Sequence, residues 1–498
     1  MCQHQRFRSL GRFLFACVFA LIIHLPILHA AGMFVTPHGA RPMARGGAFV
    51  AGADDLNSIY YNPAGLAALE MGATGYSGFA DGAFVLQRIN YQRSENGILR
   101  PAINSDSGAM FGAPLLIPQL GFARKMKFSF GHLSAGLGLW IPYTNLPRYN
   151  EPDYSTETGL RNAPNVAPQR YALISLHEGS LAKSTLLAVI NPAIAASFLN
   201  DKLMVGLGPQ LMFVYFRSKL AISSCTAVTC SPEQADFDAT VLAQAFAVTP
   251  SFNMGIIGKP LPWLKLGASF QFPFYIRSST GKIDATLPVN EFFNGARVKG
   301  RDASMALTLP AILRVGAETN FINNKLHIEL AYTYEAWSMH KEIKFQPQGI
   351  YFENVKGIDR YTLSTMSLMR KMEDTHTIHL GGEFALFQFL TVRAGAMFET
   401  SAVSDRYITI LTPDNDKALI ALGAAITNIK LLGLNWRFDL SYSHIFQADR
   451  AVKSTSNQIY PLNPIRPAQT QDISVGGIGG GIYQVQTDNI LFGVSVVR

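Results

Sequence analysis

Charged residues are scarce in this chain of 498 residues, where Asp, Glu, Lys and Arg together make up 15%. Soluble proteins carry about 25% of charged residues, whereas the hydrophobic content here is an ordinary 48%. No long apolar run follows residue 28, so the sequence predicts no membrane-spanning helix beyond that point. Low charge without such helices is typical of a transmembrane β-barrel, in which alternate residues face lipid and only the others need to be polar.

Motifs that would indicate an enzyme or a nucleic-acid-binding protein are missing as well. The net charge of +8 is scattered, without a basic run, which argues against nucleic acid as a partner. The glycine-rich stretch 476–481 lacks the Lys-Ser/Thr of a phosphate-binding loop. His376 and His379 fall on opposite faces of a predicted strand, and no hydrolase-like triad is evident. We therefore expect no metal, no cofactor and no catalytic site.

Only four cysteines are present, and Cys2 and Cys17 lie in the N-terminal segment that we expect to be removed. Cys225 and Cys230 remain, close together in a polar stretch. In the oxidising cell envelope they are predicted to form one disulfide within a loop.

Residues 1–30 are predicted to be a secretory signal peptide. Three arginines precede an apolar run over residues 13–28, and small residues follow it. Cleavage after Ala30 gives a mature chain that begins at Ala31. A lipoprotein signal at Cys17 is the alternative, but the apolar run continues past this cysteine.

Residues 31–71 lack the alternation of a strand and are predicted to form a partly helical hatch inside a closed sheet. The apolar residues between 49 and 60 fit short helical turns. Asp54 and Asp55 can cap the following turn, and Asn62-Pro63, followed by Ala64, ends it. The alternative interpretation is a small N-terminal cap on a soluble domain.

Residues 72–498 alternate between apolar and polar positions in about fourteen candidate strands, an even number as in single-chain outer-membrane barrels. The strands are expected to begin near residues 72, 117, 128, 185, 202, 241, 263, 302, 325, 375, 389, 416, 432 and 489. A soluble barrel would show the same period. The connections favour the membrane barrel over the soluble one. Short links, such as the one expected at Arg124–Lys127, alternate strictly with long loops.

The sequence therefore predicts an all-β fold, a fourteen-stranded antiparallel transmembrane β-barrel in the bacterial outer membrane, with lipid and lipopolysaccharide around it. Both ends of the barrel sequence are expected on the periplasmic, short-turn side. Four prolines in predicted strands indicate bulges or breaks in the wall, because proline cannot donate to the ladder, and the alternative at any single position is ordinary barrel curvature. They are Pro192, Pro209, Pro273 and Pro310.

The mature start Ala31-Gly32-Met33-Phe34, the Gly-Ala-Asp-Asp at residues 52–55 and the Asn-Pro-Ala at residues 62–64 resemble the FadL/TodX-type outer-membrane transporters. Further matches follow in order, at residues 307–316, 331–338, 393–403 and 413–416. The resemblance implies a barrel closed by a hatch and uptake of hydrophobic molecules. Long-chain fatty acids are the typical ligands, with aromatic hydrocarbons in some members, and release is lateral, through a gap at a kinked third strand.

The same resemblance implies where a ligand binds. It places the ligand near the mature N-terminus, at Ala31, Gly32 and Phe34, and a carboxylate contact at Lys344. Arg217 and Lys219 end a strand that supplies basic contacts in the family. The alternative is that these three cations are solvated charges at strand ends. The chain also departs from outer-membrane barrels in ending at residues 496–498 with Val-Val-Arg instead of an aromatic residue.

Three functions are thus weighed. The favoured one is a monomeric transporter that captures a hydrophobic ligand in its loops, binds it in a pocket gated by the hatch and releases it into the membrane. A general porin with a water-filled lumen is the second, and a lipid-acting enzyme of the outer membrane is the third.

Overall fold

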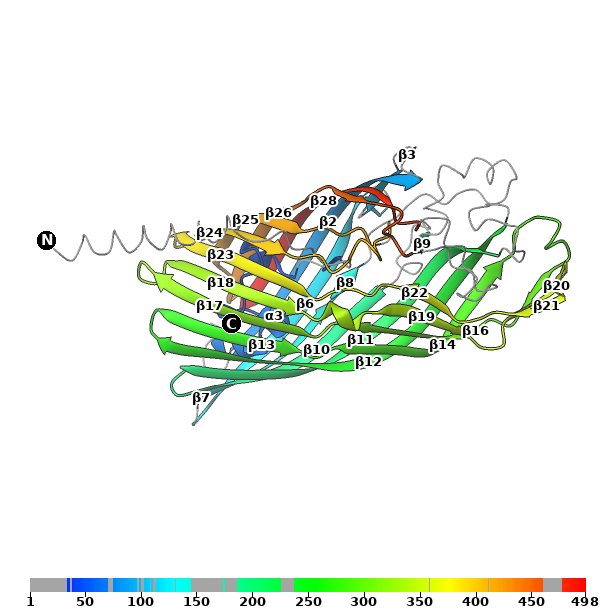
Figure 1. Ribbon diagram of the computed structural model, residues 1–498. Coiled ribbons are helices and arrows are strands. Elements are labelled where there is room, and N and C mark those ends of the chain that lie inside the picture. The colour runs from blue at the N-terminus through cyan, green and yellow to red at the C-terminus, as the bar shows by residue number, and fades with distance from the viewer. Residues whose placement is uncertain are drawn as a thin grey trace.

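Fourteen antiparallel strands close into a barrel around a short helical segment, as the sequence predicts (Figure 1). The computed structural model describes residues 34–35, 38–69, 75–95, 98–99, 103–107, 109–110, 113–129, 131–144, 173–174, 186–224, 237–357, 359–410, 412–459 and 477–498. The signal peptide, Cys225 and Cys230 lie outside these residues. The barrel closes where β2 (Tyr76–Glu95) pairs with β28 (Gly481–Val497), from Ser77 opposite Val497 to Arg93 opposite Gly481.

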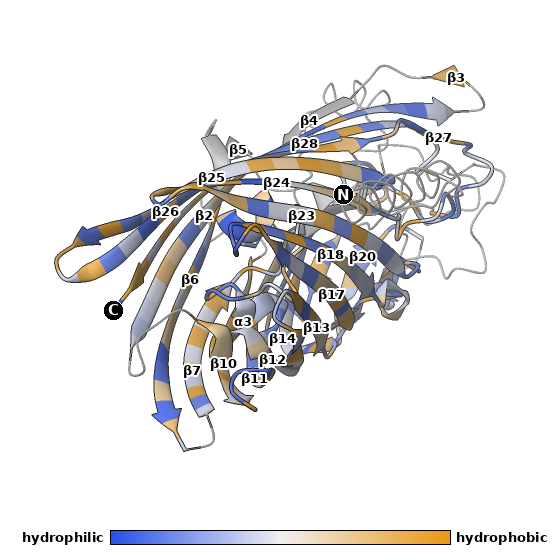
Figure 2. Cartoon of the chain, turned by 90° about the vertical axis from the view of Figure 1, so that its left-hand side faces the viewer, coloured by the Kyte–Doolittle hydropathy of each residue, from blue (hydrophilic) through white to orange (hydrophobic). Residues whose placement is uncertain are grey.

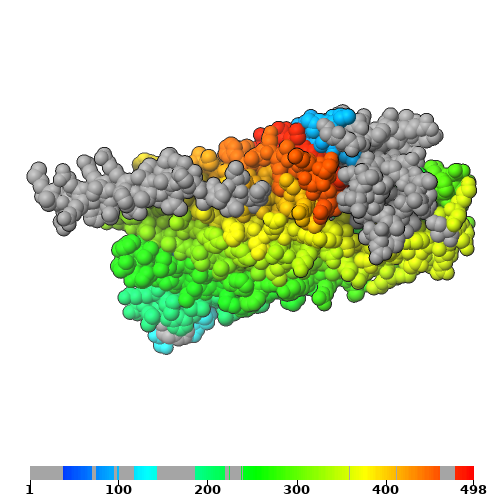
Figure 3. All heavy atoms as spheres, viewed as in Figure 1, coloured from blue at the N-terminus to red at the C-terminus, as the bar shows by residue number. Residues whose placement is uncertain are grey.

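The wall strands follow one another in chain order, as the bands of colour in Figure 3 show. After β2 come β6 (Ala113–Phe128), β7 (Gly131–Trp140), β10 (Leu186–Phe198), β11 (Leu203–Ser223) and β12 (Asp238–Leu261). Four divided strands follow, each written with its loop-side half second: β13 (Leu264–Gln271) with β14 (Phe274–Thr286), β17 (Ile312–Phe321) with β16 (Asp302–Leu309), β18 (Leu326–Glu335) with β19 (Glu342–Pro347), and β23 (Thr375–Phe387) with β22 (Met366–Met369). The circle ends with β24 (Leu390–Glu399), β25 (Lys417–Leu431), β26 (Leu434–Gln447) and β28.

Shorter elements lie in the connections. The 3-10 helix η5 (Trp337–Met339) separates β18 from β19, and β15 (Arg297–Lys299), β20 (Tyr351–Val355) and β21 (Asp359–Thr362) form a separate sheet in the loops. The remaining short strands are β1 (Phe34–Val35), β3 (Ile98–Leu99), β4 (Ile103–Ser107), β5 (Ala109–Met110), β8 (Tyr143–Thr144), β9 (Leu173–Ile174) and β27 (Arg450–Val452). Within the described ranges, no helix has the length and apolar character needed to cross a membrane.

Apolar and polar residues alternate along the wall strands, as the bands of hydropathy in Figure 2 show. This alternation places the large apolar side chains on the exposed, outer face of the wall. In β26, for example, Leu440 and Tyr442 are exposed while Ser441 and Ser443 are buried in the lumen. Large apolar side chains stand on the outer face of every part of the wall. An apolar surface of this extent would be unfavourable in water. The outer face is therefore suited to contact with lipid.

Two boundaries differ from the expectation. The last strand begins at Gly481, not near residue 489, because the ladder with β2 continues beyond the clearly alternating part. Arg124–Lys127, expected as a turn, lies within β6. The reason is that Lys125 points into the lumen, where its Nζ donates to the carbonyl of Leu69 at 3.0 Å. The charged stretch Arg124–Lys127, which resembles a turn in the sequence, thus contributes a contact between the wall and the hatch.

The prolines predicted to break the wall all lie at interruptions. Pro273 separates β13 from β14, and Pro310 separates β16 from β17. Pro192 and Pro209 face each other in β10 and β11, and the pairing stops at Ile190–Leu211 and resumes at Ile194–Leu207. A second gap lies between residues 245–252 of β12 and β14, where the hydroxyls of Thr249, Ser251 and Ser278 donate to backbone carbonyls of the facing segment. In contrast, β7, the third strand, pairs with both neighbours without interruption.

The hatch, residues 38–69, lies inside the barrel (Figures 1 and 2). It consists of α2 (Ala40–Ala44), α3 (Ser58–Tyr61) and η1 (Pro63–Ala68), and its side chains are almost entirely buried. The start of the first strand and the end of the last meet at the short-turn end, where Tyr76 and Arg498 exchange backbone hydrogen bonds of 3.2 and 2.9 Å.

Candidate functional site

The predicted Asn-Pro-Ala motif fixes the hatch against β11 and β12. The side-chain oxygen of Asn62 accepts from the N–H of Ala64 at 3.2 Å and so caps η1, in which Pro63 is the first residue. Its Nδ2 donates to the carbonyls of Val50 (2.9 Å) and Ile256 (3.2 Å). One side chain therefore holds the helix start, the hatch chain and the wall together.

The part of the wall that contacts this turn carries two glycines, so no side chains separate the wall backbone from the turn. Gly206 lies so close to Pro63 and Ala64 that a Cβ added there would overlap their backbone, and Gly255 is filled in the same way by Asn62. Glycine is needed at Gly206 because two backbones approach closely, and at Gly255 because the side chain of Asn62 occupies the space that a Cβ would take.

Glu329 holds a second part of the hatch. Its carboxylate, which is fully buried, accepts backbone hydrogen bonds from Val50 at 2.6 Å, Ala51 at 2.8 Å and Gly52 at 3.0 Å. Three successive N–H groups that converge on one carboxylate form an anion-binding nest. Arg45 Nη2 adds an ion pair with Glu329 at 2.9 Å.

Arg45 also pairs with Glu318 at 2.7 Å, and Glu318 pairs with Lys265 of β13 at 2.8 Å. These charges are buried at the level of the hatch. Removing one partner of such a group is costly because the other charge stays buried without compensation.

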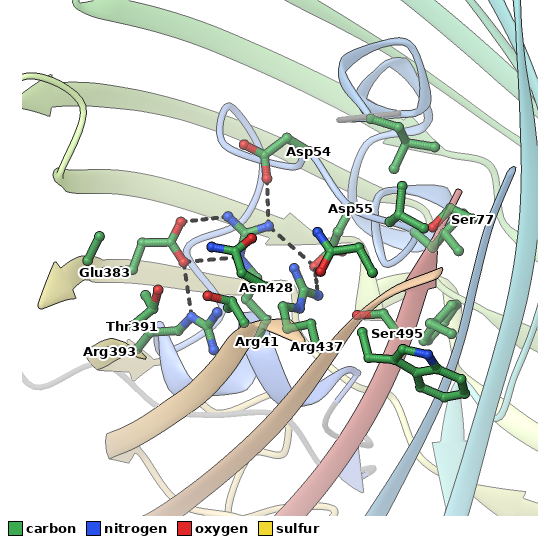
Figure 4. Close-up of a pocket in the computed structure, with 18 of the residues that line it drawn as sticks. Arg41, Asp54, Asp55, Ser77, Glu383, Thr391, Arg393, Asn428, Arg437 and Ser495 are labelled. Atoms are coloured by element: carbon green, nitrogen blue, oxygen red, sulfur yellow. Dashed lines mark hydrogen bonds and ion pairs between the residues drawn. The ribbon is translucent and has the colours of Figure 1, made fainter. Parts of the chain in front are cut away.

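Arg41 is the centre of a second ionic cluster, toward the short-turn end (Figure 4). Its guanidinium makes two hydrogen bonds with Glu383, at 3.0 and 2.6 Å, and pairs with Asp54 at 2.6 Å. Arg437 of β26 reaches Asp55 at 2.9 Å, so both aspartates of the predicted hatch motif contact a cation. Beside this cluster, a cavity of about 410 Å³ opens between the hatch and the turns.

The electrostatics of the hatch keep Asp54 charged. Burial alone would raise the pKa of Asp54, but the positive charges of Arg41 and Lys265 outweigh it, so that the pKa is lowered. Asp55 in addition accepts the N–H of Asn57 at 2.9 Å, in a turn that precedes α3, whose N-cap Asn57 makes no side-chain capping bond. The main contacts of both carboxylates, however, are ionic.

A smaller cavity of about 110 Å³ lies on the opposite, loop side of the hatch. Its hatch wall is aromatic: the ring of Tyr60 lies 3.8 Å from that of His38 and 5.0 Å from that of Tyr61. Arg314 of β17 faces these rings, with its guanidinium carbon 4.7 Å from the centre of Tyr60. Burial, assisted by the charge of Arg314, lowers the pKa of His38 to about 3, so this imidazole is neutral at physiological pH.

Beyond this cavity, the loop half of the lumen is apolar. Buried side chains of β11, β12, β14, β16 and β19 belong to one packed cluster, which we term the apolar lumen. They include Met212, Val214, Phe216, Ala243, Phe274, Ile276, Met305, Ile343 and Phe345. Phe216 and Phe345 belong to β11 and β19, and their ring centres lie 5.5 Å apart. On the side formed by β11, β12, β14, β16 and β19, the lumen is therefore apolar toward the loops, whereas the contacts at the hatch are largely ionic.

The sequence-predicted ligand residues are spread over the chain. Ala31 and Gly32 lie outside the described residues, and Phe34 pairs through its backbone with Thr144 of β8. Arg217 and Lys219 lie in β11, and Lys344 lies in β19, with β12, β14 and β16 between them.

Alternation places two of these cations apart from the apolar lumen. Lys344 is half-buried between Ile343 and Phe345, which point inward, and Arg217 alternates likewise with Phe216. Contact of these cations with a ligand stays a prediction.

The residues that the sequence reasoning missed are the inward charges of the wall. Glu318, Glu329, Glu383 and Arg314 occupy lumen positions of strands that were predicted correctly. The sequence did contain a signal for them. A charged residue on the polar face of a strand points into the lumen, and a charge buried there needs a partner. The partners themselves could not be assigned without coordinates.

Comparisons with known proteins agree with this architecture. The model of a family described as "Outer membrane protein transport protein (OMPP1/FadL/TodX)" matches residues 171–479. A "47 kDa outer membrane protein" of Pasteurella multocida (strain Pm70) is 29% identical over 121 residues, which are 24% of this chain and 25% of that protein. The match thus spans only a quarter of that relative.

Among solved structures, a FadL homologue of Pseudomonas aeruginosa is similar with a TM-score of 0.64 at 15% identity, covering 94% of this chain and 99% of the other. The toluene transporter TodX of P. putida gives a TM-score of 0.57 at 15% identity, covering 93% and 99%. The toluene transporter TbuX of Ralstonia pickettii gives 0.53 at 14% identity, covering 92% and 97%. At these identities the likeness concerns the fold.

Proposed function

The chain belongs to the outer membrane transport protein family OMPP1/FadL/TodX, and from this premise we propose that it takes up hydrophobic molecules, with long-chain fatty acids as the preferred ligands. Its place is the bacterial outer membrane. An apolar solute crosses the polar lipopolysaccharide layer poorly by itself. A protein that shields it there and delivers it to the membrane interior removes this barrier.

The apolar lumen is the observation that carries the proposal. Inward positions such as Met212, Phe274 and Phe345 would be polar in a water-filled porin, because a porin lumen is hydrated. Apolar side chains at the loop end instead favour a solute that leaves water on entry. The loops would capture such a ligand and pass it toward the hatch.

The hatch supports gated transport over open diffusion. Residues 38–69 occupy the lumen and are held by the buried ion pairs of Arg41 and Arg45. A ligand therefore meets the aromatic face of Tyr60 and Tyr61 before it can go further. Movement of the hatch requires several of these contacts to break together.

Lateral release is proposed at the gap between β10 and β11. Pro192 and Pro209 remove backbone donors from both strands, and the pairing is interrupted there. The gap adjoins the hatch, because Asn253, close to Gly208 in the gap, donates to the carbonyl of Ile59 at 2.8 Å. A wall held by fewer ladder bonds costs less to open.

A crosslink tests this route. Cysteines at Ile194 and Leu207, which are paired at the edge of the gap, should reduce ligand uptake when oxidised and restore it when reduced. A matched pair at Ile256 and Ala268, in the continuous ladder of β12 and β13, should have no effect. Equal inhibition by both crosslinks would contradict release at this gap.

An aromatic hydrocarbon is the second candidate ligand. The cavity of about 110 Å³ beside Tyr60 approaches the size of an engineered cavity of roughly 150 Å³ that holds benzene, and it is too small for a whole fatty acid. The structural likeness to toluene transporters is in line with this choice.

The decisive experiment compares three solutes. Cells that lack their own uptake system and express this protein should accumulate labelled oleate faster than control cells. Liposomes containing the protein should not swell in small sugars. Rapid swelling would favour a porin, and uptake of toluene without oleate would favour the hydrocarbon. Native mass spectrometry of co-purified lipid would identify the ligand directly.

A further inference from the structure

Five of the short turns carry a large apolar side chain at their tip. We term these side chains the apolar rim, with one member in each turn: Leu199, Trp263, Ile322, Phe389 and Leu432. Their exposed fractions range from 50% to 85%. Turns that face water are instead rich in glycine, asparagine, aspartate, serine and proline. The apolar rim is therefore unsuited to an aqueous surrounding.

Three members of the rim also have an unfavourable backbone conformation. The φ angles of Leu199, Ile322 and Leu432 are 55°, 53° and 55°. This left-handed region favours glycine and asparagine, and a β-branched residue such as isoleucine rarely adopts it. Two of the turns share a pattern, Phe-Leu-Asn-Asp-Lys-Leu at residues 198–203 and Phe-Ile-Asn-Asn-Lys-Leu at residues 321–326. Asparagine at these tips would suit both the backbone and water, so the apolar side chains point to a contact outside the chain.

The charge beside the rim is mainly positive. The shared pattern places an exposed lysine, Lys202 or Lys325, three residues after the apolar tip, and Lys430 is exposed at the end of β25. Asp201 is the one carboxylate in the five turns, all of which the structure describes. An apolar edge next to lysines matches anionic head groups that lie above acyl chains.

The distribution of the rim distinguishes a lipid from a protein partner. The five turns recur at every second strand junction of the wall, from the pair β10 and β11 to the pair β25 and β26. A protein that docks at this end would cover one side of the barrel, whereas a lipid leaflet surrounds it. Short turns face the periplasm in outer-membrane barrels, so the leaflet in question is the periplasmic one.

We propose that the apolar rim lies in the periplasmic leaflet of the outer membrane and that Lys202, Lys325 and Lys430 bind the phosphate groups of anionic phospholipids there. The apolar tips contact the acyl chains, and the ammonium groups stay at the level of the head groups. The cavity of about 410 Å³ opens between these turns, since Asn324 and Gln388 line it, and its mouth then lies at the leaflet surface. This interaction is separate from the proposed uptake and does not depend on the solute.

The fluorescence of Trp263 tests the surroundings of the rim. The protein is reconstituted in phosphatidylglycerol vesicles with and without bromine on the acyl chains. The difference between wild-type protein and Trp263→Phe isolates Trp263 from the other tryptophans, such as the buried Trp337. Bromine quenches on contact, so this difference should be smaller in the brominated vesicles. An equal difference in both would place the rim in water or against a protein and would overturn the proposal.

A triple substitution tests the preference for anionic lipid. Native mass spectrometry measures the ratio of phosphatidylglycerol to phosphatidylcholine that the purified protein retains from an equimolar mixture. Replacing Lys202, Lys325 and Lys430 by glutamine should lower this ratio about fivefold or more, because each lysine is attracted to an anionic lipid surface.

The matched control makes the same change of charge at the loop end. It replaces Arg277, Lys282 and Lys453, which are exposed, by glutamine and should leave the ratio unchanged. Folding of both triple variants is checked by the heat-dependent mobility of the barrel in gels. An equal decrease in both variants, or no decrease in the first, would overturn the role of the three lysines.

The sign of one stability change separates lipid from water at the rim. Ile322→Asn places a residue that tolerates the left-handed backbone at an exposed tip, so in water it would stabilise the turn. In the leaflet the loss of apolar contact should prevail, and the variant should unfold at a lower urea concentration than wild-type protein in phosphatidylglycerol vesicles. An unchanged or higher midpoint would contradict insertion of the rim. Oleate uptake enters none of these measurements, so their outcome is independent of the proposed function.

Discussion

The carboxylate of Glu329 lies 2.6 Å from the backbone nitrogen of Val50, which joins the interior of the wall to the middle of the hatch. The same carboxylate accepts two further N–H groups and pairs with Arg45. The hatch is thus held by its backbone as well as by its side chains. This arrangement gives the hatch a defined docked position that individual substitutions can weaken.

Replacing Glu329 should loosen the hatch. Glu329→Ala removes the acceptor of three N–H groups and one of the two carboxylates that pair with Arg45. We expect this substitution to reduce the free energy of hatch docking by about 3–5 kcal/mol. Glu329→Gln keeps an acceptor oxygen and should lose less. Hydrogen exchange of the amides at residues 50–52 measures the effect. Glu291→Gln, whose side chain is 72% exposed, is the control, and unchanged exchange in Glu329→Ala would contradict the role of this contact.

A methyl group at Gly206 should displace the Asn-Pro-Ala turn. Because the added Cβ would overlap the backbone of Pro63 and Ala64, Gly206→Ala is expected to cost about 1–3 kcal/mol. Gly258→Ala, in the neighbouring strand, meets nothing within 4 Å and is the matched control. Limited proteolysis of the hatch compares the two variants. Equal protection in both would show that the turn is not held by this fit.

Asn191 closes the gap between β10 and β11. Its Nδ2 donates to the carbonyls of Pro192 and Pro209, both at 2.8 Å, and so replaces donors that the two prolines lack. Asn191→Ala leaves these carbonyls without that donor, which costs about 1–3 kcal/mol for each buried group. Thermal unfolding followed by gel mobility should show a lower midpoint.

A second substitution tests whether Asn191 stabilises the wall by replacing the backbone donors that the prolines lack. Pro209→Ala restores a backbone N–H opposite Pro192, so Asn191→Ala should cost less in that background. A fully additive double variant would mean that Asn191 acts through packing and not through the missing donors.

Acid should undock the hatch around His38. The pKa of His38 is lowered to about 3 by burial, whereas an exposed histidine titrates near 6.5. The undocked state therefore binds more protons below pH 6.5, and docking loses roughly 1.4 kcal/mol for each pH unit as the pH falls through this window. Hydrogen exchange of residues 38–61 at pH 7.5 and 5.0, corrected for intrinsic rates, should show faster opening at the lower pH.

His38→Gln should remove the part of this dependence that His38 contributes, because an amide does not titrate, while His379 and Asp81, which also contact the hatch, remain. Asp54 is no confounding group at pH 5.0, since its lowered pKa keeps it ionised there. The same pH dependence in both proteins would assign the effect to other groups.

Much of the wall could be predicted from local patterns. A strand with one face in lipid and the other in a lumen alternates in polarity, and its ends are marked by turn residues, so the fourteen strands were predictable. The effect of a proline on a strand can be predicted locally, because proline has no N–H to donate to the ladder. Pro273 and Pro310 divide strands as expected. The Asn62-Pro63-Ala64 turn also followed from local chemistry, because capping involves neighbours in the chain.

The functional contacts could not be derived in this way. Arg314 meets Tyr60 across more than 250 residues of sequence, and Glu329 meets Val50 across a separation of 279. Lys125, which resembles a turn residue, proved to be a lumen contact of the hatch. Strand register and the depth of the hatch decide which side chains meet.

The sequence by itself therefore determined the barrel, its membrane-facing surface and the presence of a hatch, because periodic polarity and turn chemistry are local properties. The tertiary structure alone decided which charges hold the hatch and which cation faces the cavity beside Tyr60. Those pairings depend on distances between segments remote in the chain, and no local pattern contains them.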